Sequence, residues 1–467
     1  MPGPLGRPTS TLKVIPLSTQ RLVTRSAGLG SRHAAPYDGR RDYGSARVAL
    51  DPAISRDEAP GRRQRPRYRV SRSASTLRSS SGRSREVRRR RHRRLLRTIL
   101  TAGLLLVLVP AAYSYVTTMV QPSSLPLSIR TIEWIKDHQG DGLVNAAERL
   151  YYTTIGAPAK GGSGLASLPV FGLSTTGTVA PGKSVYVPPA IAPVLTPALV
   201  GEGTWRAATP ASQGAPPILV SVFRPEPDYP RQLAYVAWID TSRTQLALYP
   251  GRDEPPNAAP RGPMQVPRSQ RSRLLATFNS GFKYKDSNGG FAVNGKTLEP
   301  MVAGQGTVIA YADGHVDVTA WQGGASVGPD VLVAKQNLPL IVIGGRPNPS
   351  LNSTKEWGKT LGNAVRVWRS ALGVDSRGNL IYLAALGQTA PSLADAIIHA
   401  GAIRAIQLDI NATWPSFITY AAPGGRGAAK LVPNPAQSVN RYLVPDDRDF
   451  FTVYGRVAGV SLAVPSQ

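Results

Sequence analysis

The sequence predicts an α+β protein, in which a mostly β body with a mixed sheet and a few helices follows a disordered tail and one transmembrane helix. Three observations predict this arrangement. The 467 residues carry a net charge of +27, and 25 basic and 6 acidic side chains in residues 1–97 account for +19 of it. The 23 residues Thr98–Val120 contain no charged side chain. Beyond residue 200, short apolar runs alternate with Gly, Pro, Asn or Asp turns.

Residues 1–94 are predicted to form a disordered, basic, cytoplasmic tail. The segment is rich in Arg, Ser, Gly and Pro and has no sustained apolar period, so it buries too little surface to offset the entropy of ordering. Nucleic-acid binding by the tail is disfavoured, because neither interleaved aromatic side chains nor a folded reading domain accompanies the charge. We expect the Arg run to bind anionic lipid headgroups of the membrane instead.

Residues 95–120 are predicted to form a transmembrane signal anchor. As a helix, Thr98–Val120 would be roughly 35 Å long, enough for a hydrocarbon core about 30 Å thick. The alternative is a cleaved signal peptide, but its apolar core is only about 7–15 residues long. The preceding run EVRRRRHRRLLR predicts a cytoplasmic N-terminus at the plasma membrane and an extracytoplasmic C-terminal domain. The absence of Cys, which fits a bacterial cell envelope, excludes disulfides, zinc–thiolate sites and cysteine nucleophiles.

Residues 121–200 are predicted to contain juxtamembrane helices and a linker. Apolar side chains recur at helical spacing through Ser128–Thr154, in two pieces separated by Gly140-Asp141-Gly142. Because the remaining ligand positions of an EF-hand are missing, we interpret Asp141 as a helix N-cap rather than a calcium ligand. Residues 155–200 are rich in Gly, Pro, Ala and Ser, which is typical of a linker.

Residues 201–467 are predicted to form one domain, which is mostly strand. The turn sequence VDSRGN predicts a hairpin between two strands, expected at Ala364–Leu372 and Asn379–Leu386. Thr389 is expected to cap a helix that stops at Gly401, and a buried strand at Ala402–Asp409 follows, which makes one strand–helix–strand crossover. The strands are expected at Ile218–Phe223, Gln232–Ile239, Gln245–Tyr249, Leu274–Phe278, Gly306–Tyr311, Val316–Trp321, Val331–Lys335, Leu340–Ile343, Ala364–Leu372 and Asn379–Leu386.

Asp409 and Arg369 are the side chains predicted to carry chemistry. Asp409 ends the buried strand of the crossover, where sheets of this kind open their sites; alternatively it is a solvated residue that caps the next turn. Strand alternation places Arg369 on the apolar face of Val365 and Val367. Its guanidinium cannot lose its proton, so it is expected to pair either with an anionic ligand or with a carboxylate of the core.

The loop Thr277–Gly295 is a third candidate. Gly281 permits close approach of the backbone, and Lys283 and Lys285 lie beside it, so the loop is suited to an anion or a sugar; a Gly-rich hairpin turn has the same appearance. The five His are scattered, and the sequence contains no zinc signature, P-loop or G-x-S-x-G motif. The sequence identifies no cofactor and no metal.

Together these segments resemble the phosphodiester glycosidase family over residues 274–456. The resemblance rests on three ordered blocks, FNSGFK, RSALG and SLADAIIHAGAIRAIQLD. Ser370 replaces a Thr of the family's second block. The residues that match the family's blocks are Asn279, Gly281, Phe282, Arg369, Gly373, Leu408 and Asp409.

The chain departs from the family directly after Asp409. Where the family has three glycines and a Ser, this chain reads Ile410-Asn411-Ala412-Thr413-Trp414. Three glycines give backbone amides close access to an anion or a sugar, and side chains now fill that space. Either Asn411 and Trp414 rebuild the pocket for another substrate, or the site has lost catalysis. Trp414 is either a platform on which a sugar stacks or a core residue.

The resemblance implies a glycosidase-type hydrolase that cleaves a sugar-phosphate diester or a related envelope glycan linkage. Arg369 would hold the phosphate, and Asp409 would act as acid or base or orient a bound ion. A second carboxylate is needed, with Glu299, Asp330 and Asp395 as unranked candidates. The alternative is a non-catalytic glycan-binding or scaffold module on the same fold. The substrate-binding residues implied are Asn279, Gly281, Phe282, Lys283, Ser370, Asn411, Thr413 and Trp414.

Overall fold

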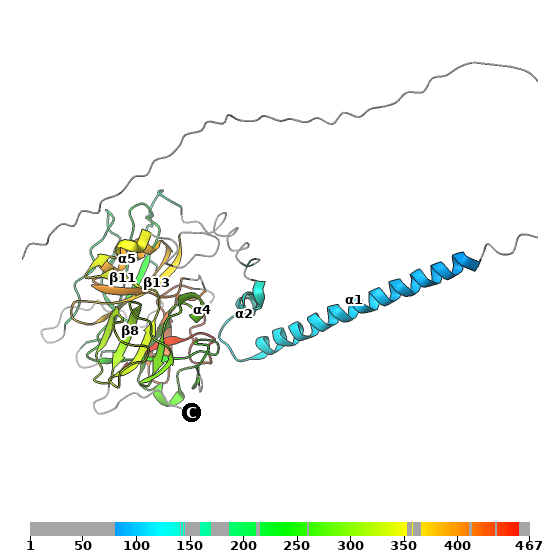
Figure 1. Ribbon diagram of the computed structural model, residues 1–467. Helices are drawn as coiled ribbons and strands as arrows, with labels where there is room; N and C mark the ends of the chain where they lie inside the picture. Colours follow the sequence, from blue (N-terminus) through cyan, green and yellow to red (C-terminus); the bar gives the residue numbers. More distant parts are fainter. Residues whose placement is uncertain are drawn as a thin grey trace, which may run out of the picture. The chain divides into compact units, whose positions relative to one another are not determined.

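The computed structural model describes residues 80–140, 142, 144, 159–169, 186–211, 215–258, 261–352, 357, 366–410, 413–434 and 437–456. Within these residues the protein is mostly β, with three antiparallel sheets and few helices (Figure 1). Residues 1–79 of the predicted tail lie outside the described residues. The described parts of the predicted linker, 159–169 and 186–200, contain no helix or strand.

The helix α1, Ser80–Val120, is one helix near the N-terminus, and its part from Glu86 to Val120 is long and apolar enough to cross a membrane. It begins 15 residues before the predicted anchor, so the prediction of disorder is wrong for residues 80–94. Arg has a favourable helix propensity, and a preformed apolar helix removes the nucleation barrier for its extension. An ion pair of 2.8 Å between Glu86 and Arg90, one helical turn apart, adds to this extension.

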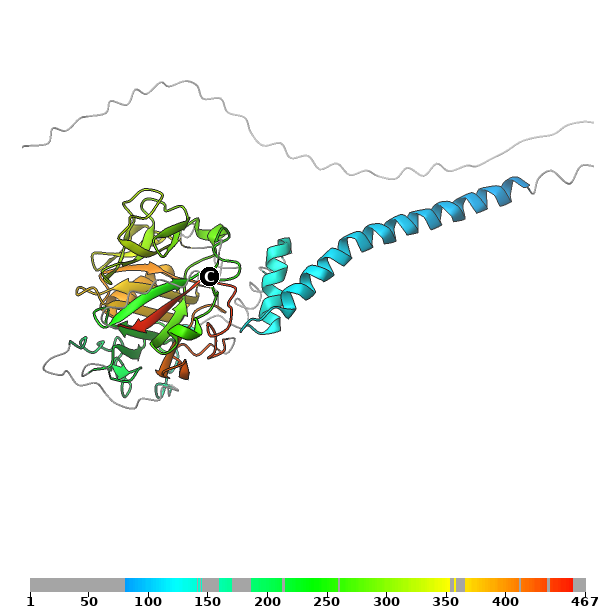
Figure 2. The ribbon, with the colours of Figure 1, turned by 90° about the horizontal axis from the view of Figure 1, so that it is seen from below.

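After residues 121–126, which are not helical, the chain forms the helix α2, Leu127–Ile135, and the π-helix η1, Lys136–Gly140. Figure 2 shows α2 beside the C-terminal end of α1. The Tyr115 hydroxyl lies 3.0 Å from Thr131 Oγ1, and Trp134 Nε1 donates to Ser114 Oγ at 3.1 Å. The chain therefore turns back on the end of α1. The predicted N-cap Asp141 lies outside the described residues.

The first sheet has eight strands in the order β1-β2-β3-β14-β13-β15-β11-β12. Its central strands are buried on both faces, which explains the continuous apolar runs of the sequence. The bounds are β1 Arg206–Ala207, β2 Ile218–Phe223, β3 Ala234–Ile239, β11 Leu340–Ile343, β12 Arg346–Pro347, β13 Val367–Val374, β14 Leu380–Gln388 and β15 Arg404–Gln407. The short 3-10 helix η3, Pro349–Asn352, follows β12.

The predicted crossover runs from β14 through α5, Ala390–His399, to β15. The Thr389 side chain accepts a hydrogen bond from the Ser392 N–H, and the Ser392 hydroxyl accepts one from the Thr389 N–H, as a capping box. β13 lies between β14 and β15 and is antiparallel to both. The expected mixed sheet is therefore wrong: the two parallel strands are not neighbours, and the strand pairs described are all antiparallel.

The second and third sheets have five strands each, in the orders β7-β6-β10-β8-β9 and β17-β16-β5-β18-β4. The 3-10 helix η2, Arg268–Gln270, precedes β5, and the single turn α4, Tyr284–Ser287, follows it. The bounds are β4 Thr244–Tyr249, β5 Leu274–Asn279, β6 Phe291–Val293, β7 Lys296–Glu299, β8 Gly306–Tyr311, β9 Val316–Ala320, β10 Val331–Gln336, β16 Phe417–Ala422, β17 Arg426–Lys430 and β18 Phe450–Gly455.

The core has two main parts, one on each face of the first sheet. On one face, side chains such as Tyr382 pack with Phe278 of β5 and Val308 of β8, so this cluster joins the three sheets. On the other face, α5 covers the sheet with buried side chains such as Leu393 and Ile397. The ends of β5 and β15 and the segment before β18 meet at the edge of the first cluster, where Asp409 and the loop after Asn279 lie.

Candidate functional site

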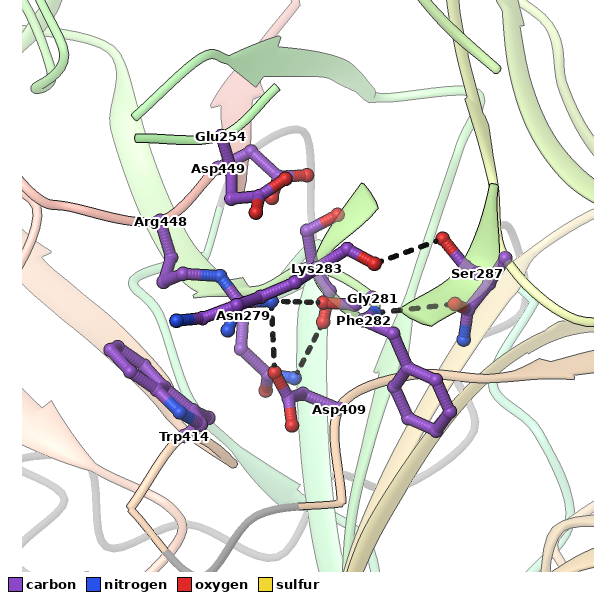
Figure 3. A network of polar contacts seen from close by, with 12 residues as sticks. Glu254, Asn279, Gly281, Phe282, Lys283, Ser287, Asp409, Trp414, Arg448 and Asp449 are labelled. Atoms are coloured by element: carbon purple, nitrogen blue, oxygen red, sulfur yellow. Dashed lines mark hydrogen bonds and ion pairs between the residues drawn. The ribbon is translucent and has the colours of Figure 1, made fainter. Parts of the chain in front are cut away.

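The centre of the candidate site is a buried ion pair between Asp409 and Arg448. Asp409 follows β15 and is held by its backbone, because its N–H donates to the Ser280 carbonyl at 3.2 Å. Arg448 precedes β18, and its Nη2 lies 3.1 Å from Asp409 Oδ2. The same nitrogen donates to the Gly281 carbonyl at 2.9 Å. Figure 3 shows Arg448 between Trp414 and the β5 end, above Asp409.

Arg448 is kept charged by its surroundings. Burial opposes the charged form, but Asp409, Glu254 and Asp449 outweigh it and raise the pKa of the guanidinium above its ordinary value. The guanidinium carbon lies 5.0 Å from the centre of the Trp414 ring. Among the described residues, Arg448 Nε has no hydrogen-bond partner although it is buried. A buried donor of this kind is available to a ligand.

Asn279 supports this centre from the end of β5. Its Nδ2 donates to Ser370 Oγ and to the next backbone carbonyl, each at 3.0 Å. Its Oδ1 accepts from the Tyr382 hydroxyl at 2.9 Å and from the Ser416 N–H at 3.0 Å. Ser370 Oγ in turn donates to the Asp409 carbonyl at 2.8 Å. These contacts use two donors and two acceptor positions of the amide, so we interpret Asn279 as a residue that positions Asp409.

The loop after Asn279 has a tight contact at Gly281. A side chain at Gly281 would lie 3.0 Å from Asn337 Cγ, so only a glycine lets the backbone carbonyl reach Arg448 without displacing Asn337. Asn337 Oδ1 accepts from the Phe282 N–H at 3.2 Å, and the Phe282 ring is buried. Gly281 and Phe282 therefore shape the loop, whereas their predicted contact with substrate stays a prediction.

Lys283 brings a second cation to the same loop. Its Nζ lies 2.9 Å from Glu133 Oε2 in α2 and 3.3 Å from Asp137 Oδ1 in η1. Burial alone would lower the pKa of Lys283, but Glu133 and Asp137 raise it above its ordinary value, so the ammonium stays charged.

Glu254, Asp449 and Lys335 complete the charged cluster, and the sequence reasoning missed all three. Glu254 is 7% exposed, and its Oε2 accepts from the Tyr284 N–H at 2.9 Å. Its pKa is raised by burial and by Asp449, against the opposing effect of Arg448. Asp449 Oδ2 lies 3.5 Å from Lys335 Nζ, and in the part of the chain that is described Asp449 Oδ1 has no hydrogen-bond partner. The run Asp446–Asp449, charged throughout and placed directly before an apolar strand, was a signal for this cluster.

Arg369 lies on the other face of its strand from Ser370. Its Nε donates to the Gln388 carbonyl at 2.8 Å, and its Nη1 donates to Gln407 Oε1 at 3.2 Å. It is 4% exposed, and burial lowers the pKa of its guanidinium to about 10. The role predicted for Arg369 as the phosphate ligand stays a prediction, and the structure adds Arg448 as a second guanidinium for that role.

The segment after Asp409 is described in part. Asn411 lies outside the described residues. The Thr413 carbonyl accepts a hydrogen bond from Gln437 Nε2. Trp414 is 3% exposed and lies 5.0 Å from the guanidinium carbons of both Arg441 and Arg448, which favours the core alternative over an open sugar platform.

The second carboxylate suggested by the structure is none of the three candidates from the sequence. Asp330 and Asp395 are exposed. Glu299 is buried, but its oxygens accept from the backbone N–H and side-chain Nδ2 of Asn257 at 2.9 and 3.1 Å. Glu254 and Asp409 both lie within electrostatic reach of Arg448. The raised pKa of Glu254 favours the protonated form of its side chain. Over the described ranges, no group of three His, Cys, Asp or Glu is arranged to hold a metal ion.

The arrangement therefore combines two carboxylates in different electrostatic environments with cations beside them. A carboxylate paired with a guanidinium stays ionised, and a buried carboxyl with a raised pKa retains its proton to a higher pH. Together the two carboxylates can take up a proton and give one. Arg448 and Lys283 can bind an anionic group next to the bond that is cleaved.

Comparison with known proteins gives weak structural neighbours only. No protein-family model matches this chain, and no curated protein matches it. The chain is structurally similar to the zebrafish N-acetylglucosamine-1-phosphodiester alpha-N-acetylglucosaminidase catalytic domain, auto-inhibited by its pro-peptide, with 15% identity over 54% of this chain and 88% of that one and a TM-score of 0.38. A hypothetical protein from Synechocystis is a second neighbour, with 15% identity over 54% of this chain and 62% of that one and a TM-score of 0.32.

Proposed function

We propose that this chain is a membrane-anchored, extracytoplasmic hydrolase that acts on a sugar-phosphate diester or a related envelope glycan linkage. The observation that carries the proposal is the buried Asp409–Arg448 ion pair with Glu254 beside it. Buried polar atoms left without partners among the described residues, on Ser280, Arg448 and Asp449, support a ligand at this place, because such atoms are otherwise hydrogen-bonded in folded proteins.

Each side chain has a role in this proposal. Arg448 and Lys283 bind the phosphate, with Arg448 suited to a planar, two-point contact. Glu254, protonated through its raised pKa, gives its proton to the leaving oxygen. Asp409 takes a proton from the attacking water, whose oxygen bonds to the sugar carbon while the bond between that carbon and the phosphate oxygen breaks. Glu254 is then ionised and Asp409 protonated, and one proton passes back from Asp409 to Glu254 before the next turnover. Arg369 keeps its predicted contact with the phosphate from the neighbouring strand.

The membrane anchor is part of the proposal. Helix α1 would span the plasma membrane, with the Arg run of residues 88–97 on the cytoplasmic side, bound to anionic lipid headgroups. The residues after Val120 would then face an envelope glycan or sugar-phosphate substrate outside the membrane.

The test is turnover by the purified full chain in detergent, with a glucosyl methyl phosphodiester as the probe. We expect wild-type protein to release glucose, and both Asp409→Asn and Glu254→Gln to stop the release. Glu299→Gln is the matched control, because Glu299 is also a buried carboxyl that accepts a backbone N–H. Binding of the diester without turnover by wild-type protein would support a glycan-binding module instead. The absence of both binding and turnover would contradict the proposal.

A further inference from the structure

Asp449 is a buried carboxylate that receives no hydrogen bond from the described residues. Its side chain is 1% exposed, and neither of its oxygens has a hydrogen-bond partner in that part of the chain. Asp446, in the same charged run, is buried as well, but it accepts from Arg441 Nε at 2.9 Å and from the Arg448 N–H at 3.0 Å. Two buried aspartates of one short segment are therefore treated differently by the fold.

The register of β5 and β18 places Asp449 opposite Ser280. Phe450 pairs with Asn279 in that register, so one position further along the two chains Asp449 faces Ser280. Directly opposed side chains lie on the same face of an antiparallel pair. The Ser280 hydroxyl is buried and, among the described residues, has no hydrogen-bond partner either. The hydroxyl across the pair therefore does not supply the hydrogen bond that Asp449 lacks.

Lys335 brings a countercharge to Asp449 from the second sheet. It lies in β10 with its side chain 3% exposed, and its Nζ is 3.5 Å from Asp449 Oδ2. The ammonium also lies 5.4 Å from the centre of the Phe291 ring in β6, the strand paired with β10. Desolvation of two ions opposes such a pair, and the carboxylate has no hydrogen bond from the described residues to offset it. The stability of the fold does not explain the pair.

A backbone contact holds Glu254 next to Asp449. The Asp253 N–H donates to the Asp447 carbonyl at 2.9 Å, so the segment that carries Glu254 runs beside the one that carries Asp449. The two carboxyl groups interact electrostatically, and Figure 3 shows them next to each other. The Asp449–Lys335 pair is thus the immediate neighbour of the carboxyl that the proposed function uses as its acid.

Charged groups face Glu254 from two elements. Arg448 and Asp449 come from the segment before β18, and Lys335 comes from β10. Burial and Asp449 raise the pKa of Glu254, while Arg448, the Tyr284 N–H and Lys335 oppose them. Of these charges, that of Asp449 has the sign of an ionised Glu254, so it is the one that disfavours loss of the Glu254 proton.

We propose that Asp449 and Lys335 are positioning residues that together keep the proton on Glu254. The proposal rests on the proposed function, in which Glu254 is the acid, and adds the residues that prepare it. An ionised Asp449 disfavours a second negative charge in the same buried place, and Lys335 makes Asp449, not Glu254, the ionised member of the two carboxyls. Asp449 and Lys335 contribute no reacting atom.

The experiment follows Glu254 by two titrations of the full chain in detergent. One is the alkaline limb of the pH–rate profile with the glucosyl methyl phosphodiester. The other is the infrared band of the protonated carboxyl that Glu254→Gln removes. Asp449→Asn takes away the like charge, so both titrations should move to lower pH by about one unit. Lys335→Met takes away the opposite charge and should move both to higher pH.

Three further variants serve as controls. Lys335→Arg keeps the charge and should leave both titrations in place. Asp449→Asn/Lys335→Met should titrate below wild type but above Asp449→Asn, because Asp449 acts on Glu254 more strongly than Lys335 does. Glu202→Gln, which breaks the buried ion pair with Arg224, should lower the denaturation midpoint and leave both titrations unchanged.

A purely structural pair gives a different result. Both single variants would then behave as Glu202→Gln does, with a lower denaturation midpoint and unmoved titrations, and this would overturn the inference. Shifts of both single variants in the same direction would overturn it too. If neither single variant folds, an unmoved double variant overturns it. If wild-type protein turns over no diester, the proposed function fails, and the infrared titration alone decides whether the pair controls Glu254.

Discussion

The Asp409 carboxylate and the Arg448 guanidinium lie 3.1 Å apart, with side chains that are only 9% and 7% exposed. Such a buried pair is weak evidence for stability, because removing both charges from water costs several kcal/mol per ion. Two apolar residues of similar volume would often serve the fold as well. The pair is therefore more readily explained by what it does for a ligand, and the following experiments separate the two explanations.

The first prediction concerns Asp409→Asn. The amide keeps the shape of the side chain but loses the charge and the ability to accept a proton, so we expect kcat to fall by about 10²–10⁴-fold. Stability should also fall, because Arg448 keeps a buried charge with one partner fewer. Activity and thermal unfolding are measured on the same preparations.

A matched control uses the buried ion pair of Glu202, which precedes β1, and Arg224, which directly follows β2. Glu202→Gln should lower the free energy of unfolding by about 3–5 kcal/mol and leave kcat of the folded protein unchanged. If Asp409→Asn behaves in the same way as Glu202→Gln, the Asp409–Arg448 pair is structural and the catalytic role of Asp409 is refuted.

The second prediction concerns pH. Because burial raises the pKa of Glu254, its acid form is present to a higher pH than for an ordinary glutamate, and activity should fall as pH rises through that pKa. Glu254→Gln should remove turnover, and Glu299→Gln should leave the pH–rate profile unchanged. A profile of wild-type protein with no alkaline limb would contradict the role of Glu254 as the acid.

The third prediction uses the same group to read stability. The pKa of Glu254 is higher in the folded than in the unfolded chain, so its contribution to stability is fully present below the unfolded pKa and is lost as pH rises through the folded one. Above that pKa, Glu254→Gln should therefore unfold at a higher denaturant concentration than wild type, because the amide oxygen can still accept from the Tyr284 N–H. An equal midpoint at all pH values would show that Glu254 carries no shifted pKa.

The fourth prediction concerns Trp414. A tryptophan that is 3% exposed and packs against two guanidinium groups behaves as a core residue, so Trp414→Ala should lower the free energy of unfolding by about 3–5 kcal/mol. Trp414→Phe should lose less, since it keeps a ring beside Arg448. Unchanged stability with a higher KM would instead identify a sugar-binding platform.

The fifth prediction concerns topology, and the absence of Cys makes it simple to test. Ser326→Cys, at an exposed position of the body, should react with a membrane-impermeant maleimide in cells with an intact plasma membrane. Ser75→Cys, in the basic segment before α1, should react only after lysis. The reverse pattern would place the body in the cytoplasm and contradict an extracytoplasmic function.

Much of the fold was accessible from the sequence, because the central strands are buried on both faces and read as continuous apolar runs. The bounds of β2, β8 and β11 were predicted as observed. The hairpin of β6 and β7 was missed although its turn, Asn294-Gly295, has the positive φ angles of 53° and 72° that an Asn-Gly pair favours. The strands after Asp409, which are β16, β17 and β18, were also not predicted.

The site was accessible only in part. Asp409 was found because it ends a buried strand, and Gly281 because its loop requires close backbone approach. Arg448 and Glu254 reach the site from distant parts of the chain, and no local pattern indicates which cation pairs with which carboxylate. The surroundings of Arg369 also depend on a distant contact, because α5 covers one face of the first sheet and no local pattern indicates which face that is.

The position of β18 in the third sheet has a consequence for the order of assembly. This strand, the last one described, lies between β4 and β5, which precede it by more than 150 residues, and Arg448 and Asp449 lead directly into it. During synthesis β4 and β5 emerge before β18, so the position between them in the sheet stays unfilled until β18 has been made. The charged cluster can form only at that moment, so a nascent or truncated chain lacks the centre of the site, and activity arises together with closure of the sheet.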